Sequence, residues 1–244
     1  MGRRQPETVS SVSDVEIVIF SGKWVSSADR MGDCRRNMET KGEFSKRNFS
    51  PTALEPIAAP MVAPDQLFAS CKKIWNSKMI IRNETIEDIA AIREVTIAAF
   101  KNLAISNQTE QFIINALREA NALTISLVAE IDGKIVGHIA FSPVTISDGA
   151  IGWYGLGPVS ILPEYQNKGM GKSLITEGLS LLKKLGGQGC VLVGHPNYYE
   201  RLGFKNLPEL VCEGVPQAVF FALPFTEKVP KGIVLFHKGF LANR

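Results

Sequence analysis

The sequence has few of the residues that build metal centres, disulfide frameworks or membrane spans. Its 244 residues include four cysteines and three histidines, and neither set has the paired spacing of a zinc site or a disulfide framework. The longest apolar runs, such as 15–20 and 219–223, are far too short to cross a bilayer. No apolar core follows the first basic residues, as it would in a secretory signal. These shortages favour a cytoplasmic protein with reduced thiols, no metal and no membrane contact.

Most of the chain also lacks a net charge of either sign. Residues 1–78 carry 12 of the 27 Lys and Arg and 9 of the 24 Asp and Glu, which leaves 15 of each in residues 79–244. The formal net charge of +3 therefore belongs to the N-terminal third. Because a nucleic-acid-binding domain needs a basic surface, the neutral remainder predicts no nucleic-acid partner.

The N-terminal third has little regular patterning. Its apolar residues follow no sustained period, and four prolines interrupt residues 51–64, which excludes a long helix or strand there. We expect residues 1–78 to be a poorly ordered extension and residues 79–244 to be the folded domain. Because regular patterning begins at Met79, the extension is also a candidate for non-native sequence upstream of the true start.

Residues 79–244 alternate strand and helix patterns, which predicts an α/β domain. Asp132-Gly133 is a strong hairpin signal between two apolar runs, and Thr85 with Asp88 has the spacing of a capping box. We expect strands at 80–82, 124–130, 134–141, 152–161, 190–193, 219–223 and 233–237, and helices that begin near Thr85 and Thr109 and span 171–184 and 197–202.

The most informative segment is the glycine-rich turn Gln166–Ser173, which lies between an expected strand and an expected helix. Such a turn suits an anion, because glycines let the backbone approach and the first helical N–H groups point outward. The end of the segment resembles a Walker A loop, but that loop needs glycine where Gln166 stands. Gln166, Gly169 and Gly171 instead match in full the Q-x-x-G-x-G diphosphate signature of GNAT acetyltransferases.

A second motif strengthens this resemblance. The apolar run 189–193 is followed by Tyr199, Gly203 and Phe204, which resembles the Tyr-x-x-x-Gly-Phe block of GNAT enzymes. The stretch from Thr124 to Phe204 also resembles the YhbS-like group of bacterial N-acetyltransferases. The resemblance covers residues 79 to about 243. It implies a GNAT fold: a mixed, mostly antiparallel sheet flanked by helices, with a V-shaped split between strands four and five.

The resemblance implies acetyl-CoA as the cosubstrate, held mainly by main-chain groups. The amides from Asn167 to Lys172 would bind its diphosphate, and the strand positions Val159 and Ile161 would bind its pantetheine arm. Gly157-Pro158 suits a bulge or bend just before them. The expected cofactor-binding residues are Val159, Ile161, Gln166, Asn167, Lys168, Gly169, Met170, Gly171, Lys172 and Asn197. Lys168 and Lys172 are equally explained as solvated surface charges.

Tyr199 stands at the family's general-acid position, where it would protonate the leaving thiolate. Its phenol, with an ordinary pKa of about 10, is a plausible proton donor. The alternative is that Tyr199 only packs between helix and sheet. Tyr198 is the weaker candidate, and Asn197 either bonds the pantetheine arm or caps the short helix.

The proton of the attacking ammonium needs a base or a water relay, and the sequence offers Glu110 and His138. Glu110 is better explained as a first-turn acid favoured by the helix dipole. His138 lies in an apolar strand and reads more simply as a hydrogen-bonded core residue. Cys190 is disfavoured as a nucleophile, because an apolar strand disfavours a thiolate.

The sequence thus predicts an N-acetyltransferase that moves the acetyl group of acetyl-CoA directly to a primary amine, on a small molecule or a protein. The alternatives are a non-catalytic acyl-CoA sensor or interaction module on the same scaffold, and a P-loop hydrolase, which Gln166 opposes. Neither residues 101–108 nor the strands after Pro216 carry a charge cluster that identifies the acceptor. A homodimer is one open arrangement.

Overall fold

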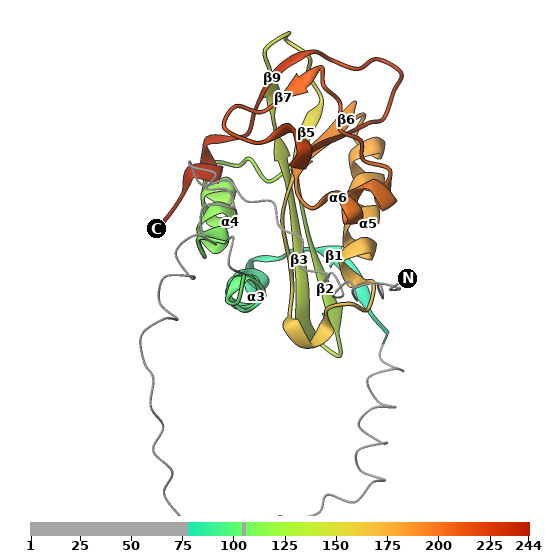
Figure 1. The fold of residues 1–244 in the computed structure, drawn as a ribbon. Helices are drawn as coiled ribbons and strands as arrows, with labels where there is room; N and C mark the ends of the chain where they lie inside the picture. The colour runs from blue at the N-terminus through green and yellow to red at the C-terminus, as the bar shows by residue number, and fades with distance from the viewer. Residues whose placement is uncertain (1–77, 104–105) are drawn as a thin grey trace, which may run out of the picture. The chain divides into compact units, whose positions relative to one another are not determined.

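The computed structural model describes residues 78–103 and 106–244 (Figure 1). Apart from Lys78, the extension expected over residues 1–78 lies outside the described residues. Within the described part, no helix has the length and apolar character needed to cross a bilayer.

Six strands form the main sheet, and their neighbours in space are not always neighbours in sequence. Their order across the sheet is β1-β2-β3-β5-β6-β8. Only β5 and β6 run parallel, and every other pair is antiparallel. The sheet is therefore mixed and mostly antiparallel, as expected. The strands are β1 (Ile80–Asn83), β2 (Ile125–Ile131), β3 (Lys134–Pro143), β5 (Trp153–Ile161), β6 (Gly189–Val193) and β8 (Phe220–Pro224).

Helices cover both faces of this sheet (Figure 1). The helices are α3 (Ile89–Phe100), α4 (Glu110–Glu119), α5 (Met170–Lys184) and α6 (Pro196–Tyr199). α3 and α4 lie on one side and α5 and α6 on the other. Short 3-10 turns complete the helical segments: η1 (Ile86–Asp88), η2 (Pro163–Tyr165), η3 (Glu200–Leu202), η4 (Gln217–Val219) and η5 (Lys238–Leu241).

Local sequence signals explain where the first helical segment starts and why α5 packs closely on the sheet. Asp88 accepts hydrogen bonds from the backbone N–H of Thr85 at 2.7 Å and from its hydroxyl at 3.0 Å, so the reciprocal half of the expected capping box is confirmed. α5 packs closely on the sheet because Gly178 faces the ring of Phe141, where a Cβ would overlap the ring.

The last expected strand lies elsewhere than in the main sheet. β9 (Gly232–Leu235) pairs antiparallel with β4 (Thr145–Ile146) and parallel with β7 (Leu210–Val211). Only Val234 of β9 is buried, so the strand has one inward side chain. It lies between β4 and β7 in a small second sheet. The short strands β4 and β7 have two residues each, too few for a period to reveal them in the sequence.

Candidate active site

The parallel strands β5 and β6 pair over only part of their length. The pairing joins Trp153–Gly155 to Gly189–Val191, and β5 then runs on to Ile161 beside no partner on that edge among the described strands. The expected V-shaped split between the fourth and fifth main-sheet strands is therefore present. It opens toward the end of β5 that leads into the glycine-rich turn.

A bulge at Gly157-Pro158 turns the backbone of β5 toward the split. Between the cross-strand pairs Phe141–Leu156 and Ile139–Val159, β5 has one residue more than β3, which confirms the expected bulge. Beyond it, Leu162 N–H donates to the carbonyl of Val136 at 2.9 Å.

Backbone groups alternate along a strand, so the groups of Ser160 face β3, as those of Leu162 do, and those of Val159 and Ile161 face the split. The bulge thus presents main-chain donors and acceptors to an extended ligand.

The start of α5 forms the second half of the site. Asn167 and Gly169 have positive φ angles of 59° and 79°, and Gly169 is the N-cap of the helix. The first backbone bond of the helix runs from Ser173 N–H to the Gly169 carbonyl at 3.0 Å. The amides of Met170, Gly171 and Lys172 belong to the first turn, where a helix supplies no acceptor for them, and the helix dipole favours an anion there.

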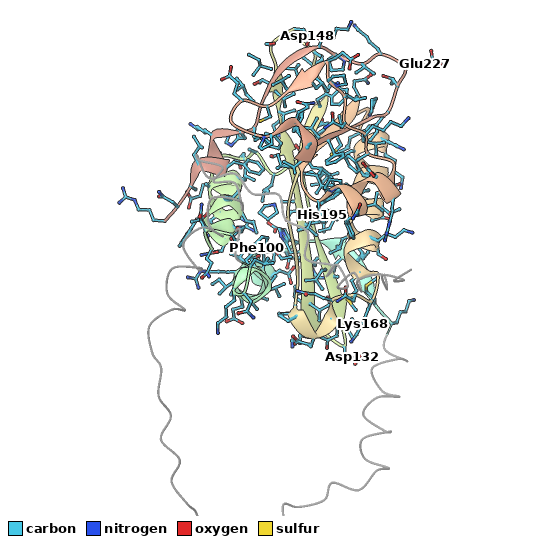
Figure 2. All side chains as sticks on the ribbon, viewed as in Figure 1. Phe100, Asp132, Asp148, Lys168, His195 and Glu227 are labelled. Carbon is cyan, nitrogen blue, oxygen red and sulfur yellow. The ribbon has the colours of Figure 1, made fainter. Side chains whose placement is uncertain are left out.

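The side chains of the turn mostly serve the turn itself. Gln166 Nε2 donates to the carbonyl of Ile161 at 3.0 Å and so ties the turn to the end of β5. Lys168 Nζ donates to the carbonyl of Glu164 at 2.8 Å and lies 5.3 Å from the ring centre of Tyr165. In Figure 2, Lys168 lies at the same end of the domain as Asp132 of the β2–β3 hairpin. Lys172 is exposed.

Tyr199 lies at the end of α6 and is fully buried. Its ring makes edge-to-face contacts with Tyr198 and Phe204, at centroid distances of 5.1 and 5.8 Å. It also covers Gly194, where a Cβ would overlap the ring. Asn197 is exposed on the same short helix. Packing therefore fixes the Tyr199 ring beside the end of β6, one border of the split.

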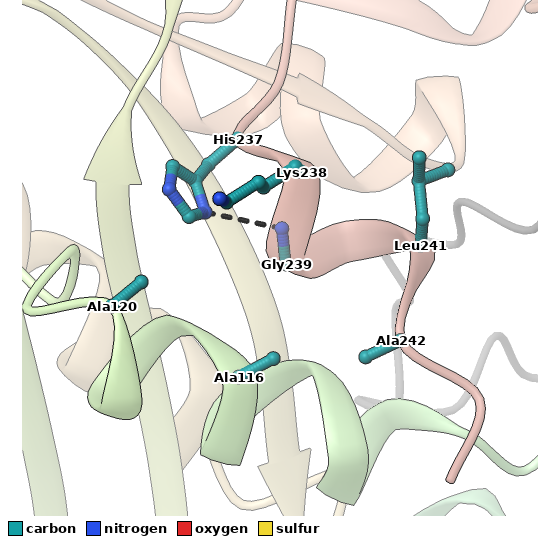
Figure 3. Close-up of a pocket in the computed structure, with 7 residues that line it drawn as sticks. All are labelled: Ala116, Ala120, His237, Lys238, Gly239, Leu241 and Ala242. Atoms are coloured by element: carbon teal, nitrogen blue, oxygen red, sulfur yellow. Dashed lines mark hydrogen bonds between the residues drawn. The ribbon is translucent and has the colours of Figure 1, made fainter.

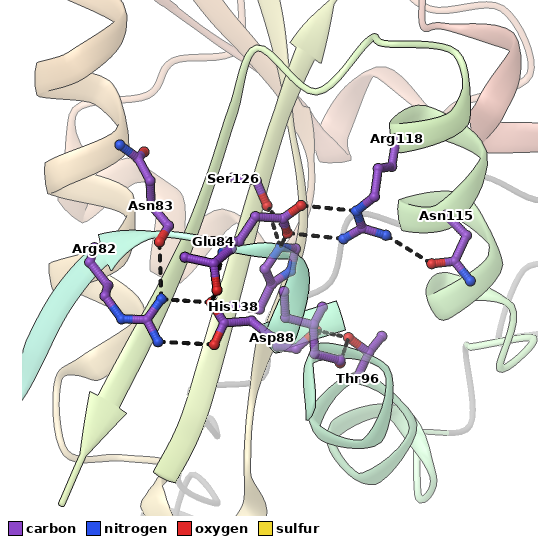
Figure 4. Close-up of polar contacts among 12 residues, drawn as sticks. Arg82, Asn83, Glu84, Asp88, Thr96, Asn115, Arg118, Ser126 and His138 are labelled. Atoms are coloured by element: carbon purple, nitrogen blue, oxygen red, sulfur yellow. Dashed lines mark hydrogen bonds and ion pairs between the residues drawn. The ribbon is translucent and has the colours of Figure 1, made fainter. Parts of the chain in front are cut away.

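On the α3/α4 side of the sheet, a carboxylate is bound by three partners (Figure 4). Arg118 of α4 donates to both oxygens of Glu84 at 2.9 Å, and Ser126 Oγ donates to Glu84 Oε2 at 2.5 Å. Burial raises the pKa of Glu84, but the nearby His138 imidazole and hydrogen bonds from Arg118 and Ser126 outweigh it and lower the pKa to about 2. Glu84 is therefore a stably ionised group.

His138 is the inner member of this network. It is fully buried, and its Nε2 lies 2.8 Å from Ser126 Oγ and 3.6 Å from Glu84 Oε2. Because the Ser126 hydroxyl donates to the carboxylate, we assign the imidazole proton to Nε2. Burial lowers the pKa of His138, and the nearby Glu84 carboxylate opposes this shift. The interpretation of His138 as a hydrogen-bonded core residue is confirmed.

Glu110 has a different environment at the start of α4. It is a first-turn acid, as expected, but its side chain is buried, with 1% of the residue exposed. Ser106 Oγ donates to Oε1 at 2.7 Å, whereas Oε2 is buried and has no hydrogen-bond partner among the described residues. Burial raises the pKa of Glu110, although the hydrogen bond from Ser106 opposes the shift.

Neither described cysteine has the features of a nucleophile. Cys190 and Cys212 are buried thiols. Burial raises the pKa of both, to about 11 for Cys212. In the part of the chain that the structure covers, no three His, Cys, Asp or Glu side chains are grouped so that they could hold a metal ion.

A shallow pocket lies between the last two turns of α4 and η5 (Figure 3). Ala116 and Ala120 form one wall, and His237 and Lys238 belong to the other. His237 Nδ1 accepts the N–H of Gly239 at 3.1 Å, so this ring closes the local turn. None of the residues expected at the cofactor site lines this pocket.

The sequence did not reveal Glu84, Arg118, Ser126 or Ser106 as members of polar clusters. The β2–β3 hairpin does predict one contact, between Ser126 and His138. Its register pairs Val128 with His138 and Ser126 with Ala140, so the two polar side chains lie on one face of the sheet. The contacts of Arg118 with Glu84 join residues 34 apart in sequence, and no local pattern predicts them.

Comparison with known proteins identifies the family. The acetyltransferase (GNAT) domain profile matches residues 123–206. The N-acetyltransferase YhbS of Escherichia coli K12 is 34% identical over 128 residues, which are 52% of this chain and 74% of YhbS. The E. coli N-acetyltransferase YjhQ is 35% identical over 122 residues, 48% of this chain and 65% of YjhQ. The chain therefore belongs to the GNAT acetyltransferase family, and the YhbS-like resemblance is confirmed.

Two solved structures share the fold over most of their length. A GNAT family acetyltransferase from Brucella melitensis, solved with acetyl-CoA, is 51% identical with a TM-score of 0.60 and covers 67% of this chain and 98% of its own. E. coli YhbS, solved with CoA, is 28% identical with a TM-score of 0.62 and covers 69% of this chain and 97% of its own. The expected GNAT fold is confirmed.

Proposed function

We propose that this protein transfers the acetyl group of acetyl-CoA directly to a primary amine, on a small molecule or a protein. The observation that carries the proposal is the bulged half of β5, which has no partner on the β6 edge among the described strands and is connected to the first turn of α5 by η2 and the glycine-rich turn. The relatives solved with acetyl-CoA and CoA support this choice of cosubstrate.

In this proposal the two halves of the site hold two parts of the coenzyme. The amides of Asn167 to Lys172 bind the diphosphate, with Lys168 and Lys172 adding positive charge. The backbone groups of Val159 and Ile161 bind the pantetheine arm, and Asn197 on α6 contacts it from the other border of the split. Gln166 keeps the two halves in register through its bond to the Ile161 carbonyl.

The chemistry follows from this placement. The Val159 N–H, turned into the split by the bulge, donates to the thioester carbonyl and stabilises the oxyanion that forms when the amine attacks. The C–S bond then breaks, and Tyr199 gives its phenolic proton to the departing thiolate. No covalent enzyme intermediate is needed.

Two glycines that flank α5 provide a matched test of the diphosphate site. Gly169 and Gly186 have φ angles of 79° and 80°, and a Cβ at either would meet no protein atom within 4 Å. Alanine at either position should therefore cost about 1 kcal/mol of stability. Only Gly169→Ala should weaken acetyl-CoA binding, by about tenfold in calorimetry, because only Gly169 lies at the proposed site. Equal affinities of the two variants would contradict the assignment.

The acid role of Tyr199 is tested by removing one oxygen. Tyr199→Phe keeps the ring contacts, so we expect acetyl-CoA affinity within about twofold of wild type. Turnover, followed by thiol release, should fall by about 10- to 100-fold, the lower part of the range for a proton donor. The same change at neighbouring Tyr198 should have a smaller effect. Unchanged turnover in Tyr199→Phe would remove it from the acid role.

A sensor function is the alternative, and wild-type protein separates the two. Acetyl-CoA binding without acetylation of any member of a broad panel of primary amines, with labelled acetyl-CoA as donor, would favour a non-catalytic acyl-CoA-binding module. We expect acetylation.

A further inference from the structure

Three buried side-chain atoms of the described residues have no hydrogen-bond partner. Among the described residues these atoms are Glu110 Oε2, His138 Nδ1 and Ser142 Oγ. His138 and Ser142 lie four residues apart on β3, so both face the same side of the sheet. That side carries α4, because Arg118 of α4 joins the network of His138 through Glu84.

Glu110 lies on the buried face of α4. It continues a stripe on α4 that includes Ile113, Ile114 and Leu117, all at most 2% exposed. Residues at this spacing share one helix face, and this face belongs to the core. α4 packs against α3 and β5. A carboxylate therefore occupies a core position on the helix beside the strand that carries Val159.

A carboxylate at a core position is costly unless a partner satisfies it. One Glu110 oxygen has Ser106 as a donor, and the other has no donor among residues 78–103 and 106–244. Leaving a buried polar group unsatisfied costs roughly 1–3 kcal/mol, which a purely structural residue such as leucine would avoid. A bound ligand that donates a hydrogen bond to this Glu110 oxygen would remove the cost.

We propose that Glu110 is the residue that binds the acceptor ammonium and takes its proton. This inference rests on the proposed function. Ser106 holds Oε1, which leaves Oε2 to receive a proton from the ammonium nitrogen. The neutral amine then attacks the thioester carbonyl carbon, the C–N bond forms and the C–S bond breaks. Tyr199 protonates the departing sulfur, the second proton of the nitrogen returns through solvent to the Tyr199 phenolate, and Glu110 later releases its proton to solvent.

The electrostatic surroundings suit a base. The raised pKa of Glu110, caused chiefly by burial, brings the carboxyl closer to the pKa of an amine. No charged side chain contributes to that shift. The titratable groups on elements packed against α4 include Lys101 after α3 and His237 and Lys238 at η5. The last two line a pocket with Ala116 and Ala120, more than a turn from Glu110.

The test compares two nucleophiles on one variant. Glu110→Gln keeps the side-chain shape and removes the base. With a primary alkylamine from the wild-type panel, which is an ammonium ion at pH 7.5, kcat/KM should fall by at least about 100-fold. With hydroxylamine, which is mostly unprotonated at that pH, the rate should change less than about threefold. Wild-type alkylamine acetylation should also fall as Glu110 protonates at low pH, and the variant should lack this acid limb.

Glu119→Gln is the matched control, because Glu119 is exposed at the other end of the same helix. It should keep wild-type rates with both nucleophiles. Equal losses with both nucleophiles in Glu110→Gln, or an unchanged alkylamine rate, would overturn the role of Glu110. Failure of the wild-type protein to acetylate any amine would instead overturn the proposed function, and the role of Glu110 with it.

Discussion

Glu84 and Glu110 are two carboxylates on the same side of one sheet with opposite environments. Glu84 receives hydrogen bonds from Arg118 and Ser126, and its pKa falls to about 2. Glu110 receives one side-chain hydrogen bond, from Ser106, and its pKa rises. Both oxygens of Glu84 have hydrogen-bond donors, whereas one oxygen of Glu110 has none among the described residues.

The difference separates a structural carboxylate from a candidate functional one. A group whose partners all come from the fold contributes to stability and has little capacity left for a ligand. A group that is desolvated and half-satisfied lowers stability, which natural proteins accept mainly at functional sites. The two environments therefore predict opposite consequences for the same Glu-to-Gln substitution.

The larger effect on the free energy of unfolding is expected for Glu84→Gln. Glu84→Gln leaves the Arg118 guanidinium without its carboxylate and should reduce the free energy of unfolding at pH 7 by about 3 kcal/mol, the lower end for a broken buried ion pair. Because the folded-state pKa of Glu84 is depressed, its contribution is present above the ordinary carboxyl pKa and is lost as pH falls toward 2.

Urea titrations of wild type and Glu84→Gln at several pH values measure this effect. The difference between the two proteins should be full at pH 7 and narrow steadily below about pH 4. A constant difference from pH 7 to pH 3 would show that the lost contribution is packing and not charge.

A smaller effect on the free energy of unfolding, with the opposite sign, is expected for Glu110→Gln. Its folded-state pKa is raised, so the wild-type protein loses stability as pH rises from the ordinary carboxyl pKa through the folded-state pKa. Glu110→Gln lacks this penalty and should be as stable as wild type at pH 8, or more stable by up to about 1 kcal/mol.

The advantage of Glu110→Gln should vanish near pH 4, and the same urea titrations detect it. A loss of 2 kcal/mol or more in Glu110→Gln at pH 8 would place Glu110 with Glu84 as a structural residue and end the contrast between them.

Local signals in the sequence revealed most of the fold. Asp132-Gly133 marked the β2–β3 hairpin, Gly157-Pro158 marked the bulge, and the Gln166–Gly171 turn marked the start of α5. Each is a backbone requirement met by adjacent residues, so a short stretch of sequence is sufficient to state it. The position of β9 was not readable, because pairing with β4 joins residues about 90 positions apart.

The candidate site could likewise be predicted only where adjacent residues determine it. The backbone parts of the cofactor site follow from the bulge and the turn, and the roles of the ten expected cofactor-binding residues and Tyr199 stay predictions. The burial of Glu110 and the partners of Glu84 depend on how α4 packs on the sheet. That packing is decided by contacts between distant segments, for which a single sequence has no local pattern.

The most direct test of the central claim is a crystal structure of this protein with acetyl-CoA. We expect diphosphate oxygens within hydrogen-bonding distance of the amides of Met170, Gly171 and Lys172, and the thioester carbonyl oxygen at the Val159 N–H. A coenzyme bound elsewhere, or one whose diphosphate lies away from the first turn of α5, would contradict the account.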